Sequence, residues 1–131
     1  MNSLVRRIDE GLRQGVAVDD FRGAMRDLAG GVSVVTVGRG DEISGMTVTS
    51  VSSLSVEPAT LIVSINRQAS SWPLLKKHGV FGVNVLSIEH RDVAERFSGA
   101  GGLSGAERFA GAEWVNLVSG VPLLAGALAA F

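Results

Sequence analysis

Short runs of β-branched and other apolar residues, separated by turn-forming residues, constrain the fold of this chain more than any other feature. The runs are VSVVTV (32–37), EISGMTVTSVSS (42–53), TLIVSIN (60–66), VFGVNVLS (80–87) and WVNLV (114–118). The first two flank GRGDE, which predicts a hairpin with its turn between Gly38 and Glu42. Pro58 ends the second run. The near-continuous apolar character of TLIVSIN predicts a strand that is buried on both faces.

Two helices are predicted before the first of these runs. In residues 3–12, apolar side chains recur at every fourth position, which predicts a short amphipathic helix. The segment DDFRGAMRDLAGG (19–31) has acidic residues at its start, an apolar stripe, and Gly30 in the position of a left-handed C-cap. We therefore assign residues 1–18 to an N-terminal helical extension and residues 19–131 to the main domain.

Two further helices are predicted between the later runs. Residues 68–79 place Pro73 in a first helical turn and end at Gly79. Ser87 is expected to cap the helix IEHRDVAERF, and SGAGGLSG (98–105) has the composition of a flexible loop. Because the helices do not alternate regularly with the strands, the pattern indicates a mainly β fold. A small β-barrel with peripheral helices fits it better than a parallel sheet does.

The composition excludes several functional classes. The chain has 131 residues, 46% of them hydrophobic, and a mean hydropathy of +0.30, which predicts one packed domain. A net charge of −1 provides neither a nucleic-acid surface nor a polybasic membrane patch. There is no cysteine, and His78 and His90 are far apart, so no metal site is expected and both histidines are assigned to helix surfaces. With no signal-peptide pattern and no apolar run of transmembrane length, a cytoplasmic location is expected.

The sequence contains none of the common catalytic motifs. It has no G-x-S-x-G, no H-E-x-x-H and no P-loop pattern. The glycines in 38–40 and 99–105 do not lie between a strand and a helix of a βαβ unit. We therefore interpret them as turns and loops rather than as a dinucleotide-binding site.

Hydroxyl side chains are concentrated in GMTVTSVSSLS (45–55). On a continuous strand Thr47 and Thr49 would project to one face. One interpretation is an edge strand whose hydroxyls face water. The other is that the hydroxyls and nearby backbone N–H groups bind a phosphorylated ligand, with Ser70 and Ser71 supplying further donors at a helix start. Simple helix capping is the plainer explanation for those two serines.

Four segments of the chain resemble the flavin reductase-like family, the small NAD(P)H:flavin oxidoreductases that serve as reductase components of two-component flavin monooxygenases. The segments are FRGAMRDLAGGVSVVTV, GMTVTSVSSLSVEPATLIVSIN, SSWPLLKKHGVFGVNVLS and AERFSG, and the resemblance runs from Phe21 to the C-terminus. It rests on F-R-x-A-M-x-x-x-x-G-G-V-x-V-V-T followed by G-M-T-x-x-S-x-x-S-x-S-x-x-P.

The resemblance implies a split β-barrel of the FMN-binding type, Greek-key-like, that works as a homodimer. Its cofactors would be FMN or FAD, with NADH or NADPH as the hydride donor. The reduced flavin would pass to a partner flavin-dependent monooxygenase. Because the cofactors carry the hydride chemistry, no side-chain nucleophile is needed.

The resemblance also implies a set of cofactor-binding residues. Those expected against the isoalloxazine and ribityl chain are Met46, Thr47, Val48 and Thr49. Those expected at the ribityl and phosphate groups are Ser50, Ser52 and Ser53. Those expected to close over the phosphate end are Ser64, Ile65, Asn66, Ser70 and Ser71. Those expected near the flavin ring or the nicotinamide are Phe97 and Arg108.

One part of the family pattern has no counterpart in this sequence. Family members usually continue past VPLLAGALAAF into further strands with a G-D-H segment, whereas this sequence ends at Phe131 without one. The C-terminal strands of the family are therefore expected to be missing, and no catalytic residue is assigned. Two alternatives stay open: a flavin-binding split-barrel protein without reductase turnover, and a structural or interaction barrel whose serines only face solvent.

Overall fold

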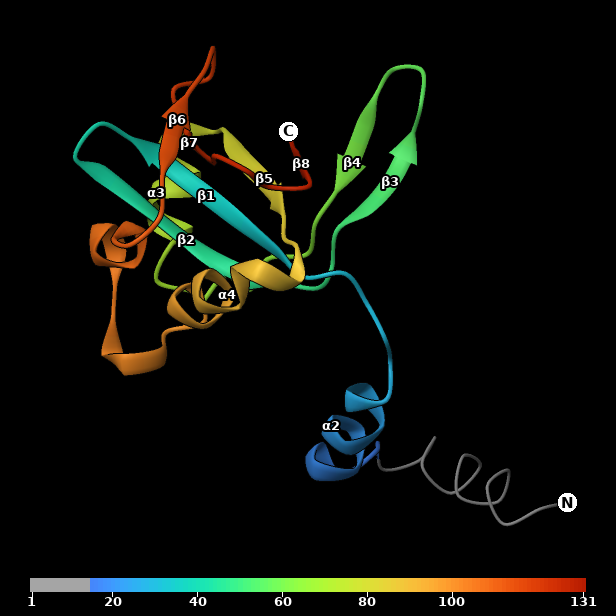
Figure 1. The fold of residues 1–131 in the computed structure, drawn as a ribbon. Coiled ribbons are helices and arrows are strands. Elements are labelled where there is room, and N and C mark those ends of the chain that lie inside the picture. Colours follow the sequence, from blue (N-terminus) through green and yellow to red (C-terminus); the bar gives the residue numbers. More distant parts are fainter. Residues whose placement is uncertain (1–14) are drawn as a thin grey trace, which may run out of the picture. The chain divides into compact units, whose positions relative to one another are not determined.

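The computed structural model describes residues 15–131, and the chain falls into two units with their boundary after Gly30. Figure 1 shows short strands, α-helices and 3₁₀ turns in this part of the chain. The predicted helix over residues 3–12 lies outside the described residues. The mainly β fold with peripheral helices is confirmed.

The described part of the first unit contains one helix, α2 (Val18–Arg26). It ends earlier than predicted: the N–H of Asp27 donates to the carbonyl of Ala24, and Gly30 plays no part in the cap. The helix closes there because Asp27 keeps right-handed helical geometry, so no left-handed residue is needed. The apolar stripe is present, and Phe21 and Met25 are exposed.

The second unit is built on a four-stranded antiparallel sheet in the order β2-β1-β5-β8. The strands are β1 (Ser33–Arg39), β2 (Glu42–Val48), β5 (Phe81–Val85) and β8 (Ala129–Ala130). The predicted hairpin is confirmed, since Arg39 pairs with Glu42 around a two-residue turn. Gly38 has a φ of +89°, and a Cβ there would lie 1.9 Å from the carbonyl oxygen of Glu42. Only glycine fits this turn.

The remaining strands form two separate pairs. They are β3 (Ser52–Ser55) with β4 (Thr60–Ile62), and β6 (Trp114–Asn116) with β7 (Pro122–Leu124). The second β-rich run is therefore broken at residues 49–51, and its two halves belong to different sheets. The prediction that TLIVSIN is buried on both faces is wrong, because β4 pairs with β3 alone among the described strands and Ile62 is 48% exposed. Strands β7 and β8 were not predicted from the sequence.

The helices of the second unit follow the predicted order. They are α3 (Trp72–His78), η1 (Ile88–His90), α4 (Arg91–Phe97), η2 (Ala100–Gly102) and η3 (Gly105–Phe109). Gly79 ends α3 with a φ of 66°, as predicted. Ser87 caps η1, and its N–H donates to Nδ1 of His90. The loop predicted over residues 98–105 instead contains 3₁₀ turns, since η2 and the start of η3 lie there.

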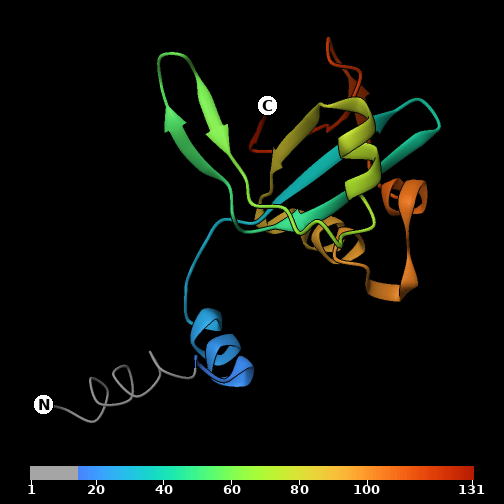
Figure 2. The same cartoon turned by 180° about the vertical axis from the view of Figure 1, so that it is seen from behind.

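Hydrophobic side chains pack on both faces of the four-stranded sheet. On one face Val35, Val37 and Val83 pack under α3, the helix seen in front of the sheet in Figure 2. On the other face Val34 and Leu124 pack with an aromatic cluster from α4, η3 and β6. The rings of that cluster lie 4.8–5.4 Å apart and belong to Phe97, Phe109 and Trp114. Side chains from both faces of β2 therefore contact a hydrophobic cluster.

Candidate functional site

The end of β2 points its side chains alternately at the two packed faces. Met46 and Val48 pack against the cluster under α3. Thr47 points the other way, and its hydroxyl donates to the carbonyl of Ala94 in α4 at 2.6 Å. These three residues are half-buried.

Beyond β2, polar side chains emerge into solvent. Thr49 and Ser50 are exposed, and the hydroxyl of Ser50 donates to the carbonyl of Ser64 at 2.9 Å while accepting from the Ser64 N–H at 3.2 Å. This pair of hydrogen bonds joins the segment before β3 to the segment after β4. The chain then turns at Asn66, whose Oδ1 accepts from the Gln68 N–H at 2.9 Å.

We call the exposed polar residues of this region the hydroxyl strip. Its members share exposure and a place between β2, the β3–β4 pair and α3, and they are Thr49, Ser50, Ser64, Asn66 and Ser70. Within residues 15–131 the side-chain hydroxyls of Thr49 and Ser70 have no protein partner. Ile65, between two members of the strip, turns inward to the cluster under α3. The structure thus brings together many of the cofactor-binding residues that the family resemblance implied.

Ser52 and Ser53 lie farther along, on the exposed β3. They line a largely apolar hollow of about 550 Å³ between the β3–β4 pair and Phe131. Among the described residues, the only side-chain hydrogen bond of either serine is a 3.4 Å contact from Ser52 to the Ser53 carbonyl. They continue the polar surface from the hydroxyl strip into this hollow.

Two of the predicted cofactor contacts are corrected by the structure. Phe97 is 1% exposed inside the aromatic cluster, so it offers no ring face to a flavin. Ser71 is fully buried, and its hydroxyl donates to the carbonyl of Gly45 at 3.0 Å and contacts the hydroxyl of Ser44 at 2.7 Å. Both are interior residues because their partners come from β2 and the core, which the sequence could not show.

Arg108 is half-buried and bound by backbone carbonyls. Its Nη1 donates to the carbonyl of Gly45 at 2.7 Å, and its Nε donates to the carbonyl of Leu103 at 3.0 Å. Gly45 was not predicted from the sequence as a partner of these groups. An isolated glycine inside a strand pattern signals a close backbone approach, and that signal was present.

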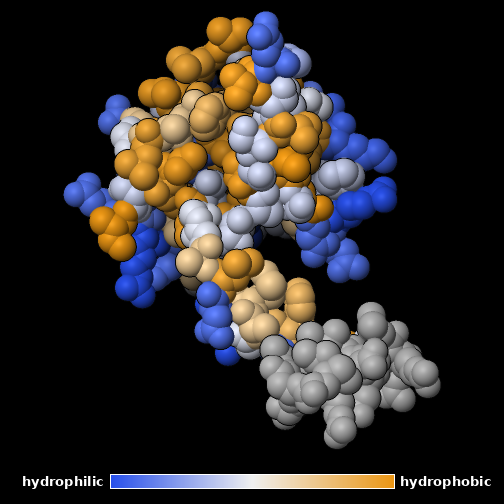
Figure 3. Space-filling model, turned by 90° about the vertical axis from the view of Figure 1, so that its right-hand side faces the viewer, coloured by the Kyte–Doolittle hydropathy of each residue, from blue (hydrophilic) through white to orange (hydrophobic). Residues whose placement is uncertain are grey.

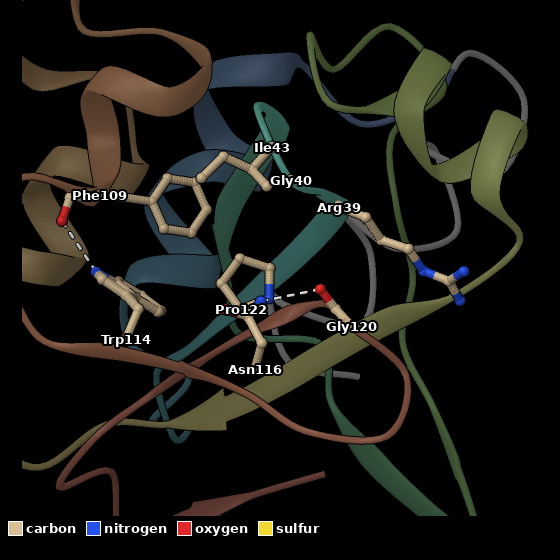
Figure 4. A pocket seen from close by; sticks show the side chains of 8 residues that line it. All are labelled: Arg39, Gly40, Ile43, Phe109, Trp114, Asn116, Gly120 and Pro122. Carbon is tan, nitrogen blue, oxygen red and sulfur yellow. Dashed lines mark hydrogen bonds between the residues drawn. The ribbon is translucent and has the colours of Figure 1, made fainter.

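A hollow of about 450 Å³ lies at the other end of the β1–β2 hairpin (Figure 4). Two of its polar side chains are occupied: Nε1 of Trp114 donates to the Phe109 carbonyl, and Nδ2 of Asn116 donates to the Gly120 carbonyl, each at 2.9 Å. None of the residues implied by the resemblance lines it. The flavin prediction therefore points to the hydroxyl strip and not to this hollow.

Charged groups hold α3 against the start of β2. Lys77 donates a hydrogen bond to the carboxylate of Glu42, and this bond together with the charge of Lys77 lowers the pKa of Glu42 below its ordinary value of 4.5. Nε2 of His78 lies 3.8 Å from the same carboxylate and is otherwise unpartnered within the described residues. His78 is only 18% exposed in its side chain, so its assignment to a helix surface is wrong.

The fold is a mainly β domain with a strip of exposed polar residues just beyond the end of an edge strand. The chain belongs to the flavin reductase-like family: a family model described as a flavin reductase like domain matches residues 25–131. This confirms the family named from the sequence. No helix among residues 15–131 is both long enough and apolar enough to cross a membrane.

Curated relatives and solved structures agree with this assignment. The chain is 42% identical over 118 residues to FMN reductase (NADH) RutF 2 of Methylorubrum extorquens, covering 90% of this chain and 67% of that protein. It is 39% identical to the 4-hydroxyphenylacetate 3-monooxygenase reductase component of Pseudomonas aeruginosa, covering 83% and 64%. The NADH:FAD oxidoreductase SgcE6 of Streptomyces globisporus superposes with a TM-score of 0.75 at 34% identity, covering 88% and 70%. The chain thus spans about two thirds of the length of these curated relatives.

Proposed function

We propose that this chain is the flavin-binding part of a flavin reductase that transfers a hydride from NADH or NADPH to FMN or FAD. The observation that supports this most directly is the hydroxyl strip. It lies at the end of β2, where the family resemblance implies the flavin. The names of the relatives, FMN reductase (NADH) and NADH:FAD oxidoreductase, agree with this activity.

The exposed hydroxyls suit the polar chain of a flavin. Thr49 and Ser70 have hydroxyls without a protein partner within residues 15–131, and a ribityl hydroxyl or a phosphate oxygen can pair with such groups. Met46 and Val48 supply the apolar base on which the flat ring would lie. The bound flavin and nicotinamide supply the hydride chemistry. The task of these residues is to hold and orient the flavin.

We propose that the finer architecture is a split barrel and that the active form is a homodimer. Figure 3 shows hydrophobic residues gathered on the side of the molecule that carries the β3–β4 pair and the C-terminal residues. Leu54, Val56 and Phe131 are 63%, 88% and 65% exposed there. A second copy packed on this side would remove that apolar surface from water. The variant Leu54→Lys should then shift the mass measured by light scattering from dimer to monomer; a wild-type protein that is monomeric at high concentration contradicts the homodimer.

We propose that the reduced flavin is passed to a flavin-dependent monooxygenase. Two relatives are named as reductase components, one of a 4-hydroxyphenylacetate 3-monooxygenase and one of a tryptophan halogenase. We also propose a cytoplasmic location, which cell fractionation tests.

The proposed activity is tested by mixing the purified chain with NADH and FMN and following NADH oxidation in air against a protein-free control. A parallel fluorescence titration measures the Kd for FMN. Thr49→Val and Ser50→Ala should each raise that Kd about tenfold, the effect of one lost hydrogen bond. Ser98→Ala, an exposed serine at the end of α4, is the matched control.

The outcomes separate the alternatives. Protein-dependent NADH oxidation supports the reductase. Flavin binding without oxidation, in a chain of confirmed intact mass, supports a flavin-binding protein without turnover. Unchanged Kd values in both variants, or no flavin binding at all, contradict the assignment of the hydroxyl strip.

A further inference from the structure

We propose that Arg108 and Ser71 are positioning residues that hold β2 at Gly45, and through the strand the hydroxyl strip beyond it, in the geometry that binds flavin. This inference rests on the proposed function and deepens it, because it assigns these two side chains to the strand and not to the cofactor. We call the two side chains and the carbonyl they bind the Gly45 clamp.

The clamp converges on one carbonyl oxygen. The Gly45 carbonyl accepts from the Ser71 hydroxyl at 3.0 Å and from Nη1 of Arg108 at 2.7 Å. A carbonyl oxygen has two lone pairs, so these two donors satisfy it completely. The donors come from the chain before α3 and from η3, two segments that are far apart in the sequence.

The position of β2 in the sheet leaves room for such a clamp. β2 lies at the edge of the described four-stranded sheet, with β1 as its only strand neighbour. An edge strand is held by hydrogen bonds on one side alone and is more mobile than an interior strand. Side-chain donors from Ser71 and Arg108 replace the missing strand at Gly45.

The remaining donors of Arg108 fix its own position. Its Nε donates to the Leu103 carbonyl at 3.0 Å, and its Nη1 also lies 3.4 Å from the Phe97 carbonyl. Within residues 15–131 no carboxylate lies within ion-pair distance of Arg108. The guanidinium therefore ties three backbone segments together by its planar fork, a geometry that a lysine ammonium does not reproduce.

Gly45 is closely packed, so a change in its position would also move the residues next to it in β2. A Cβ at this residue would lie 2.7 Å from a ring carbon of Phe97 and 2.7 Å from the carbonyl oxygen of Val35. Thr49 follows only four residues later. A displacement of Gly45 would therefore be transmitted along β2 to the start of the hydroxyl strip.

The test uses the full chain and two independent readouts. Arg108→Lys keeps the charge but loses the fork, Arg108→Ala loses both, and Arg91→Lys, an exposed arginine paired with Glu95, is the control. Amide hydrogen exchange of residues 45–50 reports the position of the strand without flavin. The Kd for FMN reports its consequence. Both Arg108 variants should speed exchange in residues 45–50 relative to residues 33–37 and raise the Kd about tenfold.

Chemical rescue supplies the last control. Millimolar methylguanidinium should restore FMN binding to Arg108→Ala and leave Arg91→Lys unchanged. Unchanged exchange in residues 45–50 overturns the clamp, and so does normal FMN binding by Arg108→Lys. Altered exchange in a protein whose wild type binds no flavin leaves the clamp standing and refutes the proposed function instead.

Discussion

Replacing Gly45 with alanine is the sharpest test of how closely β2 is packed. The added Cβ would lie 2.7 Å from the Val35 carbonyl oxygen and 2.7 and 2.8 Å from two ring carbons of Phe97. Ordinary contacts of this kind begin at 3.4 Å, so atoms must move by about 0.7 Å. The Val35 backbone cannot yield easily, because Val35 is paired with Met46 on one side and Val83 on the other.

The expected cost follows from this overlap. Inserting a methyl group into a packed core costs about 1–3 kcal/mol when neighbouring side chains or backbone must shift. For a domain of this size that loss corresponds to a fall of roughly 5–15 °C in Tm. Because the hydroxyl strip begins directly after β2, Gly45→Ala should also weaken FMN binding.

Urea denaturation followed by circular dichroism measures the loss of stability. Gly31→Ala is the matched control, since a Cβ at Gly31 would meet nothing within 4 Å. The double variant Gly45→Ala with Phe97→Leu should be less destabilised than the sum of the single variants by more than about 0.5 kcal/mol, since the smaller side chain relieves part of the clash. A change below about 0.5 kcal/mol in Gly45→Ala would refute the packing argument.

Two further predictions concern stability. Asn84 is fully buried, its Nδ2 donates to the Val34 carbonyl and its Oδ1 accepts from the Leu124 N–H. The variant Asn84→Ala should therefore lower the free energy of unfolding, measured by urea denaturation, by about 2–4 kcal/mol. A near-neutral effect would show that other groups replace these hydrogen bonds. The folded pKa of Glu42 is depressed by Lys77, so its contribution to stability is present above pH 4.5 and is lost as the pH falls through the lowered pKa. Relative to Glu42→Gln, the wild type should therefore lose stability on acidification below pH 4.5, and about 1 M salt should shrink the difference because the pair is exposed; parallel pH profiles would contradict this.

Local signals in the sequence determined the secondary structure well. The turn after Gly38, the end of α3 at Gly79 and the cap at Ser87 were all predicted, since each depends on a few neighbouring residues. The order of the glycine, threonine and serine residues in 45–55 also carried the family assignment. The prediction that Gly30 caps α2 failed because Asp27 closes the helix first by an equally local hydrogen bond.

Only the tertiary structure decided which of the predicted site residues face solvent. Phe97 and Arg108 carry the same family resemblance as Thr49 and Ser50, yet the first lies in the core and the second binds backbone carbonyls. The bond from Arg108 to Gly45 joins residues 63 positions apart. No periodicity or turn signal spans that distance, because contacts between distant segments depend on how the whole chain packs. The sequence by itself therefore determined the family and most of the helices and strands, and the packing around β2 decided which of the predicted site residues stay exposed.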